Sequence, residues 1–215
     1  SFQKVSLIYV HIEKNGNLRA SRKKAKKYSQ ALAGLLDTIN TLAPAPFGTI
    51  LDSKENLRKL IKDNYGELKS TLDKIEGQIE YDLKTYWDPD EVAKRVGQND
   101  DKISNLKEKL AQDNTSNKYE ATLRVGELIE DRMEELKRDL EEDIIDHLGP
   151  VSNSWVKNDL FDERMAANMA FLLDRVDEDK FDRAMEELGR SQAEYLKFNY
   201  NGPWPPFNFV DLALE

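Results

Sequence analysis

The sequence predicts an α+β protein of two domains: a small N-terminal domain of strand and helices, and a C-terminal domain with the ferredoxin-like βαββαβ order. Three observations predict this. Several segments carry apolar residues every three or four positions, which is the helical period, and others alternate or are β-branched, which is typical of strands. From Gly77 onward the predicted elements run strand, helices, strand, strand, helix, strand. The 215 residues include 8 Phe, 8 Tyr and 3 Trp, which is enough for a packed core.

In the N-terminal domain, predicted over residues 1–76, a strand comes first. Residues 5–12 are β-branched and aromatic, and the turn-forming residues 15–17 follow them. A helix is predicted next, and Pro44 and Pro46 end it because proline cannot continue a helix. The apolar stripe of this helix consists of Tyr28, Leu32, Leu35, Ile39 and Leu42.

Residues 47–51 are predicted as a short strand, and a second helix is predicted to begin at Asp52. Glu55, three positions after Asp52, completes a capping-box pattern. Gly77 marks the end of this segment, and we place the domain boundary at residues 76–78. The buried face of the helix is predicted as Leu57, Leu60, Ile61, Leu68, Leu72 and Ile75.

The C-terminal domain, predicted over residues 77–200, begins with a half-buried strand. Residues 79–87 alternate large and polar side chains, and Asp88-Pro89 has the character of a helix start. Residues 98–118 are polar, and we expect a mobile segment at 114–117. A long helix follows and ends at Gly149-Pro150; its apolar positions are Val125, Ile129, Met133, Leu136, Leu140, Ile144 and Leu148.

The remaining elements complete the predicted sheet. Residues 151–161 are predicted as a strand through Trp155 and then a loop, and residues 168–173 as a buried strand. Asp177 is predicted to cap a helix that ends near Gly189, and residues 195–200 form the last strand. Residues 201–215 form a tail rich in proline and aromatic residues, which we expect to pack on the second domain.

Composition and motifs exclude several classes of function. The chain has no cysteine and no apolar run long enough to span a bilayer, so a soluble cytoplasmic protein is expected. It has no nucleophile elbow, phosphate-binding loop or dinucleotide fingerprint. The two histidines, His11 and His147, lie on different predicted elements, and the acidic residues 174–182 lack the glycine of a calcium loop. We therefore predict no catalytic residue, no metal site and no cofactor.

Two charged segments have opposite sign. Six cations within nine residues could contact phosphate or an acidic partner, or form a solvated helix face; they are Arg19, Arg22, Lys23, Lys24, Lys26 and Lys27. The long helix before Gly149 is mostly acidic and could select a basic partner. The formal net charge of -9 argues against general nucleic-acid binding.

The tail resembles a known family. Residues 201–210 resemble the Gly-Pro-Trp-Pro-Pro-Tyr-x-Phe-Val ending of the gas vesicle protein F/L family, with Phe207 where Tyr is common. Residues 44–49, 77–80 and 165–173 resemble further blocks of that family, and the segment before Pro44 is shorter than usual. The matching positions, which we take as candidate packing or partner contacts, are Phe47, Gly48, Thr49, Asn168, Phe171, Gly202, Pro203, Trp204, Pro205, Pro206, Phe207 and Phe209.

The resemblance implies a protein that is needed to assemble gas vesicles in the cytoplasm and is not a catalyst. Its implied partners are the small hydrophobic shell protein and other accessory proteins. We expect the first domain, with residues 47–49 and the cationic helix, to contact the shell protein, and the tail to fasten its own domain. The alternative is a single-stranded nucleic-acid-binding module on a ferredoxin-like sheet, although the sequence lacks the Lys/Arg-Gly-Phe strand motif of such modules.

Overall fold

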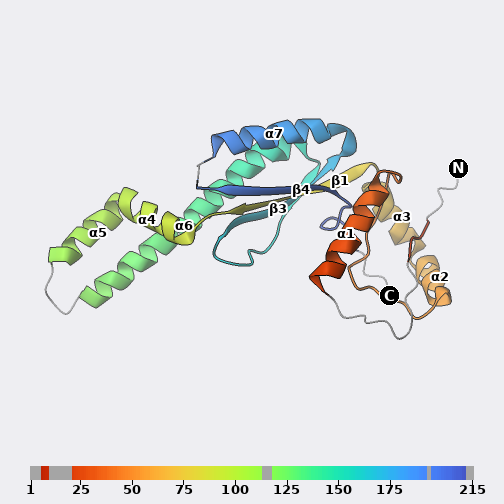
Figure 1. Cartoon of the computed structure of the whole chain (residues 1–215), viewed down its shortest axis with the longest axis horizontal. Coiled ribbons are helices and arrows are strands. Elements are labelled where there is room, and N and C mark those ends of the chain that lie inside the picture. The colour runs from red at the N-terminus through yellow and green to blue at the C-terminus, as the bar shows by residue number, and fades with distance from the viewer. Residues whose placement is uncertain (1–5, 10–20, 113–117, 193–194, 212–215) are drawn as a thin grey trace. The chain divides into compact units, whose positions relative to one another are not determined.

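The computed structural model describes residues 6–9, 21–112, 118–192 and 195–211 (Figure 1). Contacts divide the chain into a first unit, Ser1–Glu80 with Pro203–Glu215, and a second unit, Tyr81–Gly202. The predicted domain boundary at residues 76–78 stays a prediction. The tail differs from the prediction, since Pro203–Glu215 groups with the first unit and not with the second. The physical reason is that Asn208 hydrogen-bonds to the buried Glu80 of that unit.

The first unit contains three helices within its described residues: α1 (Arg22–Leu36), α2 (Lys54–Asp63) and α3 (Tyr65–Lys74). Helix α1 contains Tyr28, Leu32 and Leu35 of the predicted apolar stripe but ends before Ile39 and Leu42, and its buried residue is Leu36, which is not in the predicted stripe. The Leu35 carbonyl accepts from the backbone N–H groups of Thr38 and Ile39, which closes a turn. The predicted strand at 5–12 is not seen in residues 6–9, which have no regular structure; its other residues lie outside the described ones.

Two predictions for residues 47–75 were wrong. Residues 47–51 form a turn and an irregular segment in place of a strand. The single predicted helix is two helices separated at Asn64, whose backbone leaves the helical conformation with φ −105° and ψ 17°. Ser53, one residue after the predicted cap, accepts from the Asn56 N–H through Oγ at 3.1 Å. Of the predicted apolar face, Leu68 and Ile75 are buried.

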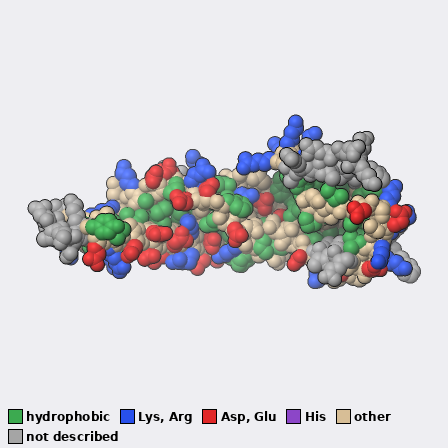
Figure 2. All heavy atoms as spheres, turned by 90° about the horizontal axis from the view of Figure 1, so that it is seen from below, with side chains coloured by type: hydrophobic (Ala, Val, Ile, Leu, Met, Phe, Trp, Pro, Cys, Tyr) green, Lys and Arg blue, Asp and Glu red, His purple; other side chains and the backbone are tan. Residues whose placement is uncertain are grey.

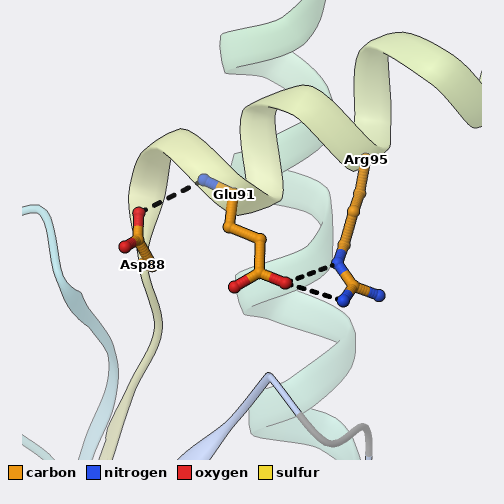
Figure 3. Close-up of polar contacts among 3 residues, drawn as sticks. All are labelled: Asp88, Glu91 and Arg95. Atoms are coloured by element: carbon orange, nitrogen blue, oxygen red, sulfur yellow. Dashed lines mark hydrogen bonds and ion pairs between the residues drawn. The ribbon is translucent and has the colours of Figure 1, made fainter.

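The N-terminal part of the second unit follows the prediction except at one helix. It contains β1 (Gln78–Tyr86) from Tyr81 onward, α4 (Pro89–Asn99), α5 (Asp101–Gln112) and α6 (Lys118–Leu148), and a 3-10 turn, η1 (Gly149–Val151), follows. Asp88 Oδ1 caps α4 by accepting from the N–H groups of Asp90 and Glu91, and Figure 3 shows the bond from Glu91. Helix α5 is not predicted, because its sequence is polar apart from a few residues such as the buried Ile103.

The C-terminal part of the second unit contains β2 (Ser154–Lys157), β3 (Met165–Asp174), η2 (Arg175–Asp177), α7 (Glu178–Ser191) and β4 (Lys197–Trp204). The four strands form one sheet in the order β2-β3-β1-β4. Strand β2 is antiparallel to β3, with Trp155 opposite Phe171. The protein is therefore a mixed structure of helices and a four-stranded antiparallel sheet, as the predicted α+β class requires. Asp177 precedes α7 as predicted, but its side chain contacts Lys180 in place of the helix backbone.

The core of the second unit lies between the sheet and two helices. Figure 1 shows α6 and α7 side by side along the sheet, and α4 and α5 beside the N-terminal part of α6. Nine of the ten residues of β3 are buried. Because apolar residues recur every three or four positions in α6 and α7, each helix buries one face. These buried residues are Leu140, Ile144 and Leu148 of α6 and Phe181, Met185 and Leu188 of α7.

Candidate functional site

Residues 46–49 form a tight turn in the first unit. The Pro46 carbonyl accepts from the Thr49 N–H at 3.1 Å and from Thr49 Oγ1 at 2.8 Å. Gly48, the third residue of the turn, has a φ of 96°. A type II turn needs a positive φ at this position, which glycine adopts without strain. The Phe-Gly-Thr block is therefore a turn sequence, and it leaves the Phe47 ring 41% exposed.

Three segments of the first unit meet in an aromatic cluster of Tyr28, Phe47 and Phe207. The Tyr28 ring lies 5.6 Å from that of Phe47 and 6.4 Å from that of Phe207, measured between centroids. Tyr28 Oη donates to the Ala45 carbonyl at 2.5 Å, and burial raises the pKa of Tyr28. The structure thus brings together Phe47 and Phe207, two predicted site residues. Tyr28, which joins them, is predicted only as an apolar helix position.

The tail is held by a buried carboxylate. Glu80 is 1% exposed; its Oε2 accepts from the Asn208 N–H and its Oε1 from Asn208 Nδ2, each at 2.7 Å. Pro205 and Pro206 are buried, whereas Pro203, Trp204, Phe207 and Phe209 are half-buried. The Pro205 carbonyl accepts from the Phe207 N–H at 2.7 Å, which folds the tail back on itself. Glu80 ends one of the family-like blocks, but its role as the anchor of Asn208 is not predicted.

Gly202 belongs to a different aromatic cluster, in the second unit. A Cβ atom at Gly202 would lie 2.4 Å from Tyr81 Cδ1, so only glycine fits there. The Tyr81 ring stacks on Tyr200 at 4.8 Å and on Phe181 at 5.6 Å. Tyr81 Oη donates to Glu178, and Tyr200 Oη donates to Asp182 at 2.7 Å. Burial and then these hydrogen bonds raise the pKa of both tyrosines.

Asn168 and Phe171 are packing residues of strand β3. Asn168 Nδ2 donates to the Asp159 carbonyl at 2.8 Å and so holds the loop after β2. The Phe171 ring is fully buried against Phe181, at 5.5 Å between centroids. The predicted site residues therefore do not form one site: residues 47–49 and 203–209 lie in the first unit, and Asn168, Phe171 and Gly202 lie in the second.

The first unit displays an apolar surface. Six of its large apolar side chains are between 41% and 57% exposed, and we call them the apolar surface: Leu7, Ile8, Tyr9, Phe47, Ile50 and Leu51. Lys54 Nζ lies 5.6 Å from the centroid of the Tyr9 ring, so the segment with Tyr9 approaches the start of α2. By contrast, Figure 2 shows acidic, basic and apolar side chains intermingled over the helical part of the second unit.

A shallow hollow of about 260 Å³ lies beside α4 and α6 in the second unit. Val92, Val96 and Leu136 give it an apolar lining, and Arg95 and Arg132 supply charge. Glu91 Oε1 holds Arg95 through Nε at 3.1 Å and Nη2 at 2.7 Å (Figure 3). Arg132 in turn donates to Glu135 at 2.6 Å. These local pairs occupy both guanidinium groups, and the lining residues include no nucleophile beside a general base.

The described residues contain neither a candidate metal site nor a candidate membrane-spanning helix. Among the described residues, no three His, Asp or Glu side chains lie where they could hold a metal ion. His147 Nδ1 lies 2.7 Å from the Asp143 carbonyl of its own helix, and His11 lies outside the described residues. None of the helices in the described ranges combines the length and the apolar character needed to cross a bilayer.

These observations define a two-unit α+β protein whose distinctive residues form tight turns, aromatic packing and an apolar surface. Comparison with known families agrees with the resemblance seen in the tail. The family model described as "Gas vesicle synthesis protein GvpL/GvpF" matches residues 2–211. The chain belongs to this family.

Individual relatives support the assignment. The chain is 28% identical over 176 residues to gas vesicle protein F1 of Halobacterium salinarum, a match that covers 81% of this chain and 62% of that protein. It is 24% identical over 195 residues to gas vesicle protein F of Microcystis aeruginosa, covering 90% of this chain and 79% of that protein. The chain thus spans less than two thirds of the Halobacterium relative. These relatives give the nucleic-acid alternative no support.

A solved structure shares the fold. The crystal structure of the gas vesicle protein GvpF from Anabaena sp. PCC7120 matches with a TM-score of 0.80 at 24% sequence identity. The match covers 94% of this chain and 82% of that one. The likeness establishes the mixed helix and sheet architecture of this chain.

Proposed function

We propose that this chain is an accessory or minor structural protein of gas vesicle assembly, which binds the hydrophobic shell protein and other accessory proteins. In this proposal it works at the gas vesicle in the cytoplasm and performs no chemistry of its own. The observation that carries the proposal is the apolar surface of the first unit, in a chain of the gas vesicle synthesis family.

The physical argument concerns exposed apolar area. A shell subunit that excludes water must expose apolar surface before it assembles, and such surface aggregates unless another protein covers it. The apolar surface of the first unit offers a complementary cover. Burying a fully exposed side chain of this size is worth about 1.5–3 kcal/mol, and Ile50 is 50% exposed, so several such contacts together can hold a partner reversibly. The aromatic cluster of Tyr28, Phe47 and Phe207 would keep the Phe47 part of this surface in place.

We also propose that the second unit has the ferredoxin-like layout, with α5 as an addition to it. The strand order β2-β3-β1-β4 and the element order from β1 to β4 support this layout. This layout would give the second unit a rigid sheet on which Tyr81 and Tyr200 pack against α7. In this proposal the partner is bound by the first unit.

The test is co-purification of the shell protein with charged variants of the apolar surface. We expect Ile50→Glu combined with Leu51→Glu to lower recovery of the shell protein about tenfold or more, since the loss of 1.4 kcal/mol of binding has this effect. Both side chains are at least 41% exposed, so the fold should be retained, which circular dichroism would check.

The matched control changes the exposed residues Tyr119 and Leu123 of α6 to Glu in the same way. These side chains are 76% and 51% exposed, but they belong to the second unit, and recovery should equal that of the unchanged protein. If the two double variants recovered equal amounts of the shell protein, the proposal that the apolar surface contacts it would be contradicted.

A further inference from the structure

Helix α1 carries only positive charge, gathered in its first two turns. Its charged residues are Arg22, Lys23, Lys24, Lys26 and Lys27, and it has no acidic residue. We define the cationic face as Arg22, Lys23, Lys26 and Lys27. All four are exposed, and none takes part in an ion pair within the part of the chain that the structure describes.

The cationic face points away from the core of the first unit. Successive helical residues are rotated by about 100°, so the four cations cover an arc of about 140°. Tyr28 and Leu32 lie on the opposite side of the helix, and Tyr28 joins the aromatic cluster. The face is therefore free of the packing that holds α1 in its unit.

When no partner is bound, the charges of the cationic face destabilise helix α1. The N-terminus of a helix is the positive end of its dipole, which disfavours cations in the first turn. Arg22 and Lys26, and likewise Lys23 and Lys27, stand four residues apart, where like charges repel. An anionic surface laid over the face would remove both penalties, so the pattern favours an acidic partner.

Helix α6 holds the opposite pattern near its other end. We define the acidic face as Asp139, Glu142, Asp143 and Asp146, all exposed, and residues 139–146 include no Lys or Arg. None of the four takes part in an ion pair among the described residues, although Asp143 accepts a hydrogen bond from Gln192 at 3.3 Å. Acids near the C-terminus of a helix oppose its dipole, as cations do near the N-terminus.

We propose that the cationic face of α1 binds the acidic face of α6 in a second copy of this chain. Each face contains two pairs of charges four residues apart, a spacing of about 6 Å along the helix, so the charges can match in register. The positive end of one helix dipole also meets the negative end of another. Because every chain carries both faces, the contact joins unlike surfaces and can extend into rings or filaments.

The test is sedimentation velocity over a range of protein concentrations at low and high salt. We expect self-association in about 0.05 M NaCl that is lost in about 1 M NaCl, where the Debye length falls to about 3 Å. The triple substitution Lys23→Glu, Lys26→Glu and Lys27→Glu should raise the dissociation constant of self-association about tenfold or more. Asp139→Lys with Glu142→Lys and Asp146→Lys should do the same, and both sets combined in one chain should restore association.

Lost contact can be separated from lost folding. Each set of reversals places charges in the sense that the helix dipole favours, so the thermal midpoint of either variant should equal or exceed that of the unchanged protein. As a matched control, reversal of the three acids Glu120, Glu127 and Glu130 in the N-terminal half of α6 should leave association intact.

The proposal is overturned if the unchanged chain stays monomeric at every concentration, or if the combined reversal fails to restore association. It is also overturned if the cationic face binds poly(U) or anionic lipid vesicles while the chain stays monomeric. The variant with Ile50→Glu and Leu51→Glu should still self-associate, so this proposal and the shell contact can fail separately.

Discussion

At the scale of single residues, Gly202, a position that resembles the family, must be glycine because the structure leaves no room for a side chain there. Its Cβ would meet the Tyr81 ring, which is stacked on Tyr200. We expect Gly202→Ala to lower the free energy of unfolding by about 1–3 kcal/mol, the usual cost of overpacking. Urea denaturation followed by circular dichroism measures this change.

Gly189 provides the matched control. It lies in α7, and a Cβ there would meet no atom within 4 Å. Gly189→Ala should be neutral or stabilising by up to about 1 kcal/mol, because alanine favours the helical conformation. If both substitutions changed stability alike, the proposed close approach of Gly202 to Tyr81 would be wrong.

At the scale of elements, two tyrosines join the sheet to α7. Tyr81 of β1 and Tyr200 of β4 donate hydrogen bonds to Glu178 and Asp182 of that helix. The pKa of both tyrosines is raised in the folded chain, by burial first, above the value near 10 expected for the unfolded one. Above about pH 10 the unfolded chain therefore binds fewer protons than the folded chain, and stability falls as pH rises.

We expect the urea midpoint to decrease above about pH 10 in the unchanged protein. The decrease should be smaller in a variant with Tyr81→Phe and Tyr200→Phe, which has no hydroxyl to titrate at these positions. Tyr119→Phe, at a tyrosine that is 76% exposed, should follow the unchanged protein. An identical decrease in all three proteins would argue against the raised pKa values.

Elements with a strong period were predictable, and those fixed by local hydrogen bonds were less so. Strand β1 and helices α6 and α7 repeat apolar residues at a strand or helix period, and β3 contains a short continuous apolar run, so the sequence pattern identifies these four elements. Helix α5 places few residues in the core, although Asp100 Oδ1 caps it by accepting from Lys102 and Ile103. That cap, and the Phe47-Gly48 pair for the turn, are the signals that could have corrected the prediction.

At the scale of the whole molecule, the tail sequence identifies the family but does not reveal what the tail contacts. Asn208 binds Glu80 across 128 positions of sequence, and Phe207 approaches Tyr28. No local pattern encodes such a pairing, because periodicity reports which side of an element is buried and not what covers it. The sequence therefore predicts candidate residues, but it does not predict how these residues divide between the two units.

The same contacts predict the effect of shortening the chain. A chain that ends at Trp204 lacks the buried Pro205 and Pro206 and leaves the carboxylate of Glu80 without Asn208. Removing one partner of a buried polar group costs about 1–3 kcal/mol, and the lost apolar packing adds to this. We expect amide hydrogen exchange to become faster in α1 and α3 of the first unit, while β3 and the C-terminal part of α6 remain protected.

The substitution Asn208→Ala separates the two contributions. It removes the hydrogen bond from Nδ2 to Glu80 but keeps the backbone N–H and both prolines, so its effect on α1 and α3 should be smaller than that of truncation. If truncation instead speeded exchange mainly in β3 and α7, the tail would stabilise the second unit, as its sequence alone suggests. The outcome therefore decides which unit the proline-rich tail holds together.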